Sequence, residues 1–173
     1  MCTLIALHQR HRDFPLVVAA NRDELYARRT GPATVTGGAL LAGRDLEKGG
    51  SWLGVSARGF FVGLTNQRGL APPDVALRSR GEVVVSALAQ PTLEAAVDWL
   101  VTLDARVYNA FNVLLGDGAE LFVAYARPAS SRIELAVLPP GIYALPNDRL
   151  GSLEFPKIDR AVELAEPLAT LGW

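Results

Sequence analysis

The chain has 173 residues, 50% of them hydrophobic, with 17 Lys and Arg against 18 Asp and Glu. That is enough for one domain with a substantial core, and it excludes the basic surface that nucleic acid or an anionic membrane requires. One cysteine and two histidines exclude a disulfide framework and show no zinc-type spacing, so no metal or cofactor is expected. Without a secretory signal pattern or an apolar run of spanning length, a soluble cytoplasmic protein is the default.

The chain begins Met1-Cys2-Thr3-Leu4-Ile5, so removal of Met1 would leave the only cysteine as the first residue. A terminal cysteine carries a thiol and a free α-amine, and an amine with a pKa of ~7.7–8.0 can be the base for its own thiol. Cys2 is therefore a candidate nucleophile that needs no histidine. A lone cysteine is more often a small buried core residue, and that alternative stays open.

Strands are predicted over residues 3–8 and 14–20, each apolar on both alternating faces, as in strands covered on both sides. A polar hairpin loop joins them, and its histidines, His8 and His11, are interpreted as solvated. The second strand runs into Asn21-Arg22-Asp23-Glu24, which is either a hydrogen-bonded turn or a functional tetrad. Alternation puts its members on opposite faces in pairs, so all four can serve one site only if the strand has ended.

Residues 28–32 are predicted to form an exposed loop, and residues 40–45 a short strand leading to Gly49-Gly50-Ser51-Trp52-Leu53-Gly54. That stretch lacks the order of a phosphate-binding loop, and no helix pattern follows it, so a turn feeding a strand from Trp52 is predicted. Another doubly buried strand, residues 60–66, ends at Asn66.

From Ser79 the period changes, and helices are predicted around residues 83–88 and 93–101, with Ser79 and Thr92 as N-caps. An antiparallel meander follows, with strands over residues 111–115, 120–126, 132–138 and 141–145. Asn147 comes directly after the last strand, and residues 158–168 predict a final helix. The order is α+β, and strands that are apolar on both faces favour two stacked sheets covered by helices.

The strand-end asparagines suggest a chemistry. Acyl transfer on an amide requires a nucleophile, a base and hydrogen-bond donors at the oxyanion. Cys2 and its amine would supply the first two, and the side-chain amides of Asn66 and Asn147 the third.

These motifs, with Gly63-Leu64-Thr65-Asn66, Phe111-Asn112-Val113-Leu114-Leu115 and Phe155-Pro156-Lys157, resemble in order those of the NRDE family, also called the transport and Golgi organisation protein 2 family. The resemblance covers essentially the whole chain. It implies one domain over residues 1–173 with a four-layer αββα sandwich of the N-terminal-nucleophile hydrolase type, built on two stacked, mainly antiparallel sheets. Family members are usually longer, so part of the fold is expected beyond Trp173. The family is linked to haem trafficking and to lipid and mitochondrial metabolism, with no agreed substrate.

The chain is more distantly similar to the choloylglycine hydrolase and penicillin V acylase group, cysteine amidases of the same fold. This likeness implies that Cys2 is the nucleophile, that Asp23 orients the terminal amine, and that Asn66 and Asn147 complete the site. The group's arginine three residues before its aspartate is replaced here by Ala20, and its distal arginine would lie beyond the chain. We assign substrate binding to Asn21, Arg22 and Trp52.

Two functions remain open at this point. The first is an N-terminal-nucleophile-type amidohydrolase that acts on a linear non-peptide amide, with Cys2 as nucleophile after Met1 removal. The second is a non-enzymatic binding or trafficking protein for haem or an acyl or lipid metabolite on the same fold. Either one implies a small-molecule substrate or hydrophobic metabolite as partner, with no nucleic acid and no membrane span.

Overall fold

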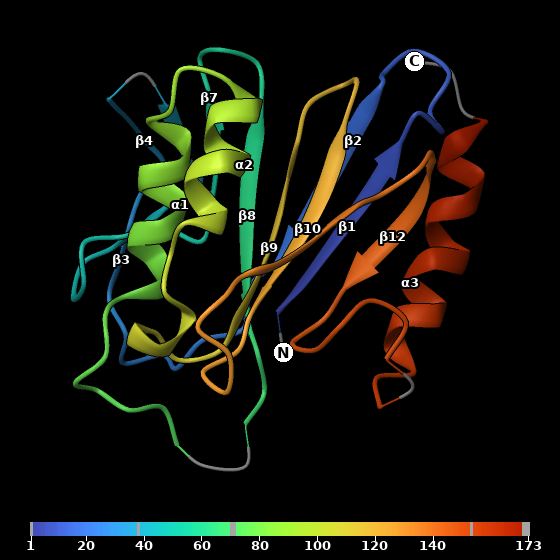
Figure 1. The fold of residues 1–173 in the computed structure, drawn as a ribbon. Coiled ribbons are helices and arrows are strands. Elements are labelled where there is room, and N and C mark those ends of the chain that lie inside the picture. Colours follow the sequence, from blue (N-terminus) through green and yellow to red (C-terminus); the bar gives the residue numbers. More distant parts are fainter. Residues whose placement is uncertain (1, 38, 70–71, 153, 171–173) are drawn as a thin grey trace.

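The computed structural model describes residues 2–37, 39–69, 72–152 and 154–170 (Figure 1). Met1, whose removal the nucleophile hypothesis requires, lies outside the described residues. The strands are β1 (Thr3–His8), β2 (Leu16–Asn21), β3 (Thr30–Gly31), β4 (Thr34–Thr36), β5 (Ala39–Leu41), β6 (Arg44–Asp45), β7 (Leu53–Ser56), β8 (Phe61–Asn66), β9 (Phe111–Gly116), β10 (Leu121–Ala126), β11 (Glu134–Val137) and β12 (Gly141–Leu145). The helices are α1 (Arg80–Leu88), α2 (Leu93–Val101) and α3 (Lys157–Ala165), with 3₁₀ turns at Ala105–Val107 and Glu166–Ala169. Among these helices, none is long and apolar enough to cross a membrane.

The strands form two main sheets. One has seven strands in the order β11-β10-β9-β8-β7-β5-β4, and the other has three in the order β12-β1-β2, while β3 pairs with β6. Every pairing between these strands is antiparallel. The predicted α+β class with antiparallel sheets is confirmed.

Three apolar clusters hold the elements together. Leu88 of α1 and Phe111 of β9 belong to the cluster between α1, α2 and the seven-stranded sheet. Leu4 of β1 and Leu114 of β9 belong to the cluster between the two sheets. On the outer face of the three-stranded sheet, Ile158 of α3 packs in the third cluster. Helices therefore cover the outer face of each sheet, α1 and α2 on one side and α3 on the other (Figure 1).

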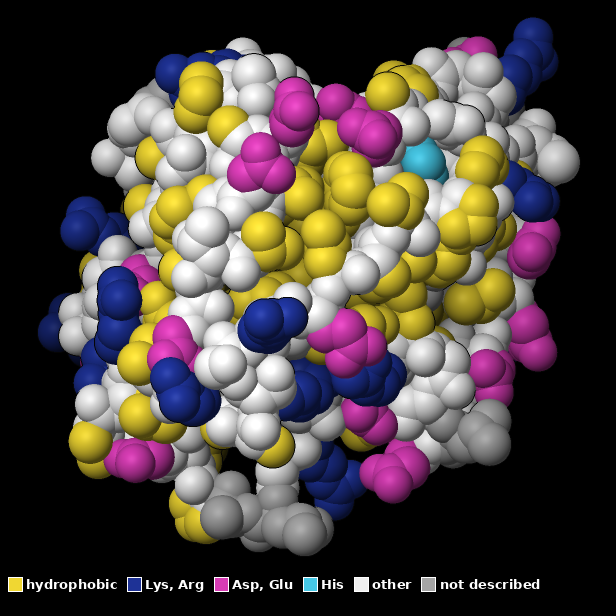
Figure 2. Space-filling model, viewed as in Figure 1, with side chains coloured by type: hydrophobic (Ala, Val, Ile, Leu, Met, Phe, Trp, Pro, Cys, Tyr) yellow, Lys and Arg dark blue, Asp and Glu magenta, His cyan; other side chains and the backbone are white. Residues whose placement is uncertain are grey.

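The prediction of strands covered on both faces holds for β1 and β8 but is wrong for β2. Residues 3–8 and 61–65 are almost all buried, whereas the end of β2, residues 19–21, is exposed. The reason is position, because β2 is an edge strand of the three-stranded sheet. Other edge strands also expose apolar side chains, such as Val137 of β11. Figure 2 shows hydrophobic side chains gathered across the middle of one face.

The predicted meander is confirmed for β9, β10 and β11, but β12 leaves it. β12 pairs with β1 in the other sheet, with Leu145 opposite Leu4. Pro139 and Pro140 stand between β11 and β12, and proline provides no backbone N–H for a continuing ladder. The end of β12, and Asn147 after it, therefore reach the cysteine end of β1.

Three local expectations are corrected as well. His8 is 2% exposed rather than solvated, because it is the last residue of the central strand of its sheet. Within the predicted exposed loop, Thr30 and Gly31 form β3, and Gly31 is buried where β3 pairs with β6. Thr92 caps α2 by accepting a hydrogen bond from Ala95 N at 3.1 Å, whereas the Ser79 side chain makes no capping bond to α1.

The first turn of α1 lies directly against the loop that precedes β7. A Cβ atom on Gly50 would lie 2.4 Å from the carbonyl carbon of Gly81, and Ser51 N donates a hydrogen bond to Gly81 O at 3.1 Å. Contact between two backbones at this distance leaves no room for a side chain at position 50. This contact fixes the start of α1 beside the Trp52 segment.

We expect Gly50→Ala to lower the free energy of unfolding by about 1–3 kcal/mol, because the added methyl group meets backbone atoms that cannot rotate away. Urea denaturation measures the effect. Glu47→Ala, an exposed change in the same loop, is the control and should shift stability by less than about 0.5 kcal/mol. Equal midpoints for the Gly50 variant and the unchanged protein would contradict the close contact.

Candidate active site

A cleft of about 170 Å³ opens beside the cysteine end of β1. The ends of β2 and β8 and the first turn of α1 contribute to its walls. Five of the residues singled out from the sequence line it: Cys2, Asn21, Arg22, Trp52 and Asn66. Antiparallel pairing explains the meeting, because Thr3 at the start of β1 lies opposite Asn21 at the end of β2.

Cys2 is half-buried in this cleft. Its Sγ donates a hydrogen bond to the backbone carbonyl of Asp23 at 3.6 Å. Burial raises the pKa of the thiol, and the negative charge of Glu24 adds to the effect, while the positive charge of Arg22 and a hydrogen bond with the Asn147 side chain lower it. The balance is a raised pKa, so the thiol is mainly protonated near neutral pH.

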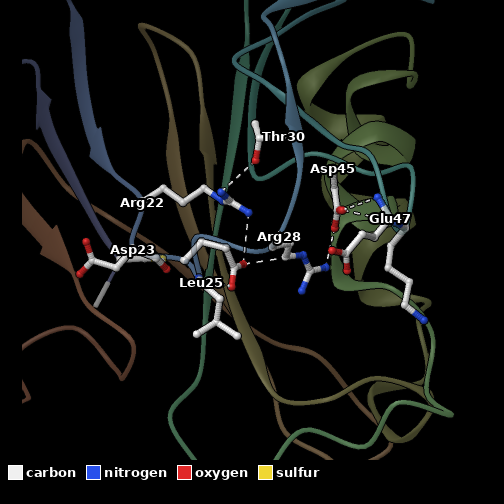
Figure 3. Close-up of polar contacts among 10 residues, drawn as sticks. Arg22, Asp23, Leu25, Arg28, Thr30, Asp45 and Glu47 are labelled. Carbon is white, nitrogen blue, oxygen red and sulfur yellow. Dashed lines mark hydrogen bonds and ion pairs between the residues drawn. The ribbon is translucent and has the colours of Figure 1, made fainter.

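Three of the four residues in the polar tetrad at the end of β2 line the cleft. Because β2 ends at Asn21, strand alternation no longer applies, and Asn21, Arg22 and Glu24 all line the cleft. Asp23 accepts a hydrogen bond on Oδ1 from Asn21 Nδ2 at 3.0 Å. Its carboxylate points away from Arg22 and Arg28 (Figure 3). Cys2 therefore meets the Asp23 backbone, while the Asp23 side chain binds its neighbour in the tetrad.

Arg22 is held in place from three sides. Its guanidinium forms an ion pair with Glu24 at 3.1 Å and donates a hydrogen bond to Thr30 Oγ1 at 3.3 Å. It also lies over the Trp52 ring, 4.0 Å from the ring centroid, a cation–π contact. Two of the three residues assigned to substrate binding, Arg22 and Trp52, thus contact each other, and Arg22 is oriented before any ligand arrives.

A second arginine, Arg28, extends the ion-pair network along the same wall (Figure 3). Its guanidinium pairs with Asp45 and lies 3.8 Å from Glu24. Burial raises the pKa of the Asp45 carboxyl, but hydrogen bonds from Arg28 and from the backbone N–H groups of Glu47 and Lys48 outweigh it and hold that pKa below its usual range. Arg28 was not predicted as a site residue, because residues 28–32 were expected to form an exposed loop.

Asn66 also lines the cleft, whereas Asn147 lines an adjoining pocket to which Asn66 contributes as well. Asn147 Nδ2 donates a hydrogen bond to Asn66 O at 2.6 Å, and Arg68 N donates to Asn147 O at 2.7 Å. The Asn147 side chain also acts to lower the pKa of the Cys2 thiol. Asn147 is thus joined to Asn66 through the Asn66 backbone, and the role of the two side-chain amides at an oxyanion stays a prediction.

A wholly buried amide, that of Asn112 in β9, binds both β8 and the segment that follows β12. Its Nδ2 donates to Thr65 Oγ1 at 3.0 Å and to Asp148 O at 3.0 Å, and lies 3.3 Å from Pro146 O. Its Oδ1 accepts from Arg127 Nη2 at 2.8 Å. Asn112 thus joins two strands of the seven-stranded sheet to the segment that carries Asn147. The sequence signal was available, because Asn112 is a lone polar residue in an apolar strand.

We expect Asn112→Ala to lower the free energy of unfolding by about 1–3 kcal/mol, because Asp148 O and Thr65 Oγ1 lose a donor and Arg127 loses an acceptor. Asn109→Ala is the matched control, since among the described residues the Asn109 side chain bonds to the Asp74 backbone alone, in an exposed setting. It should cost under about 1 kcal/mol. Thermal unfolding compares the two, and an equal cost would contradict the role given to Asn112.

Arg22→Ala should raise the pKa of the Cys2 thiol further, because it removes a nearby positive charge. At pH 8 the higher pKa leaves less thiolate, so alkylation by iodoacetamide should slow by about two- to tenfold. Arg160→Ala is the control, since Arg160 lies on α3, is exposed, and forms an ion pair with Glu163 on the same helix. A rate profile across pH that is unchanged by Arg22→Ala would contradict this coupling.

The fold has a counterpart among solved structures. It resembles that of the Caenorhabditis elegans N-acylethanolamine-hydrolyzing acid amidase ortholog, with a TM-score of 0.64 and 14% sequence identity. The match covers 99% of this chain and 80% of that chain. At this identity the likeness concerns the fold alone.

Sequence comparison identifies the family. The chain is 34% identical to the Homo sapiens Transport and Golgi organization protein 2 homolog over 144 residues, and 36% identical to the Bos taurus homolog over 143 residues. Each alignment covers 78% of this chain and 51% of the relative, so the chain spans about half the length of these relatives. The family model for Transport and Golgi organisation 2 matches residues 1–170. The chain belongs to the Transport and Golgi organisation 2 family.

Proposed function

We propose that this chain is an N-terminal-nucleophile-type amidohydrolase that cleaves a linear, non-peptide amide, with Cys2 as nucleophile after Met1 is removed. The proposal includes the finer description of the fold, in which the order of helices, sheet, sheet and helix is the αββα sandwich of that class. The observation that carries it is that Cys2 and Asn66 line one cleft, with the Asn147 side chain bound to the Asn66 backbone in the adjoining pocket.

The chemistry follows from the groups at the cleft. Once Met1 is gone, the α-amine of Cys2 takes the thiol proton, and Sγ attacks the amide carbon of the substrate. The Asn147 side-chain amide, fixed by the Asn66 carbonyl, donates to the oxygen that becomes negative. The C–N bond then breaks, the leaving nitrogen takes the proton from the amine, and a thioester remains on Cys2. Water, activated by the same amine, hydrolyses it to a carboxylic acid and the free thiol.

Removal of Met1 also changes the electrostatics of the thiol. A free ammonium on Cys2 itself would favour the thiolate, and Arg22 acts in the same direction. These two charges would offset the burial that raises the thiol pKa. Asp23, whose backbone already contacts Sγ, is the residue assigned to orient the amine.

One observation favours the second candidate, a carrier for haem or an acyl or lipid metabolite. The pKa of the Cys2 thiol is raised by burial, whereas a nucleophile benefits from a thiolate. In a carrier the same cleft would hold the metabolite by contact alone, and the state of the Cys2 amine would not matter.

Intact-mass spectrometry of the purified protein and a fluorogenic assay decide between the two. We expect the mass to show loss of Met1, and we expect release of aminocoumarin from a series of N-acyl aminocoumarins with acyl chains of increasing length. Cys2→Ala should abolish release. A version with an uncleavable extension before Met1 keeps Cys2 but blocks its amine, and it should be equally inactive because the base is lost.

Circular dichroism in the near ultraviolet checks that both altered proteins remain folded. Retention of Met1 in the purified protein would overturn the hydrolase proposal. So would equal hydrolysis by Cys2→Ala. Binding of hemin or an acyl chain that is unaffected by the extension, without hydrolysis by any form, would support the carrier.

A further inference from the structure

The cleft is more cationic than the rest of the chain. Five basic side chains line it against three acidic ones, although the chain as a whole has a formal net charge of −1. The basic residues are Arg22, Arg28, Lys48, Arg78 and Arg80. The excess is therefore local, and a binding site that concentrates one sign of charge favours a ligand of the opposite sign.

Three of these cations are already committed to carboxylates. Arg22 pairs with Glu24 at 3.1 Å. Arg28 pairs with Asp45, and Arg78 with Glu82. Lys48 is exposed, so water can solvate its ammonium. The remaining cation, the Arg80 guanidinium, has no carboxylate partner among the described residues.

Arg80 is half-buried at the first position of α1. Its Nη1 donates one long hydrogen bond, 3.4 Å, to Ala110 O. No carboxylate lies within 4.0 Å of it in the part of the chain that the structure describes. A guanidinium carries five N–H donors, and partial burial without an anionic partner is costly. Most of its hydrogen-bonding capacity is thus unused in a place where water is partly excluded.

Arg80 and Cys2 line the same cleft. Burial and the charge of Arg28 lower its pKa, while Glu24 and a Cys2 thiolate raise it. A guanidinium stays protonated at any physiological pH. Close contact between Gly50 and Gly81 also fixes the turn on which Arg80 stands. The positive charge of Arg80 is therefore permanent and is held at the cleft.

We propose that the ligand of this cleft carries an anionic group, a carboxylate or a phosphate, which the Arg80 guanidinium binds while the reactive carbonyl group faces Cys2. This rests on the proposed function for the role of Cys2. A planar guanidinium fits both groups through two parallel N–H···O bonds. The preferred substrate is then an amide with an acidic substituent, which should bind better than a neutral amide of the same length.

Paired alkylating reagents test this without any turnover. Cys2 is the only cysteine, so iodoacetate and iodoacetamide both report on it alone, and the first carries the negative charge. Both react with the same thiolate, so the ratio of their rate constants cancels any change in the thiol pKa. We expect Arg80→Met to lower the iodoacetate-to-iodoacetamide ratio by about three- to tenfold at low salt.

Two further variants serve as controls. Arg80→Lys keeps the charge and should retain most of the ratio. Arg160→Met removes one exposed arginine from α3 and should leave the ratio unchanged, which separates the local effect from net charge. A ratio for Arg80→Met equal to that of the unchanged protein would overturn the proposal, whatever the hydrolysis assay shows.

A protection experiment needs no variant and so does not depend on folding of Arg80→Met. Glutarate or inorganic phosphate should slow alkylation of Cys2 by iodoacetamide, while the neutral glutaramide should not. Protection by glutarate alone assigns a carboxylate, and protection by phosphate alone assigns a phosphate. Failure of both anions at tens of millimolar would overturn the proposal, and hydrolysis of neutral amides would still stand on its own evidence.

Discussion

The buried amide of Asn112 is the contact on which the cleft most depends. β8 and β9 belong to the seven-stranded sheet, whereas the segment after β12 continues a strand of the three-stranded sheet. Asn112 binds Thr65 on one side and the carbonyl groups of Pro146 and Asp148 on the other, so it ties the sheets together at one end. Without it, buried acceptors would lose a donor, and the segment that carries Asn147 would be held against Asn66 by fewer bonds.

The two walls of the cleft are chemically different, and the thiol lies between them. One wall carries arginines in ion pairs, with Arg22 fixed over Trp52. The other carries the amide of Asn66, whose backbone carbonyl accepts a hydrogen bond from Asn147. An amide wall suits a developing oxyanion, and a cationic wall suits an acidic substituent. A cleft of this kind can orient an amide across Cys2, and it can equally hold an acyl metabolite if the thiol stays protonated.

Much of the fold could be predicted from the sequence because its strands and helices follow clear apolar periods. The partners of two strands could not be predicted. β12 leaves the meander to pair with β1 in the other sheet, and β2 lies at the edge of that sheet, where its end is exposed. Of the site, Cys2, Arg22 and Asn66 were found because each lies where an apolar strand begins or ends. Arg80 gave no signal, because one arginine at the start of a helix is indistinguishable from the others until the fold brings it to the cleft. Asn112 did give one, as a polar residue inside an apolar run.

The central claim is that Cys2 forms a covalent acyl intermediate. Intact-mass spectrometry after rapid acid quenching of the Met1-free protein with an N-acyl aminocoumarin tests it most directly. The account predicts an added mass equal to the acyl group, located on the N-terminal peptide and removed by hydroxylamine as a thioester should be. Release of aminocoumarin with no such adduct at any time, and an equal rate when Cys2 is replaced by alanine, would contradict it.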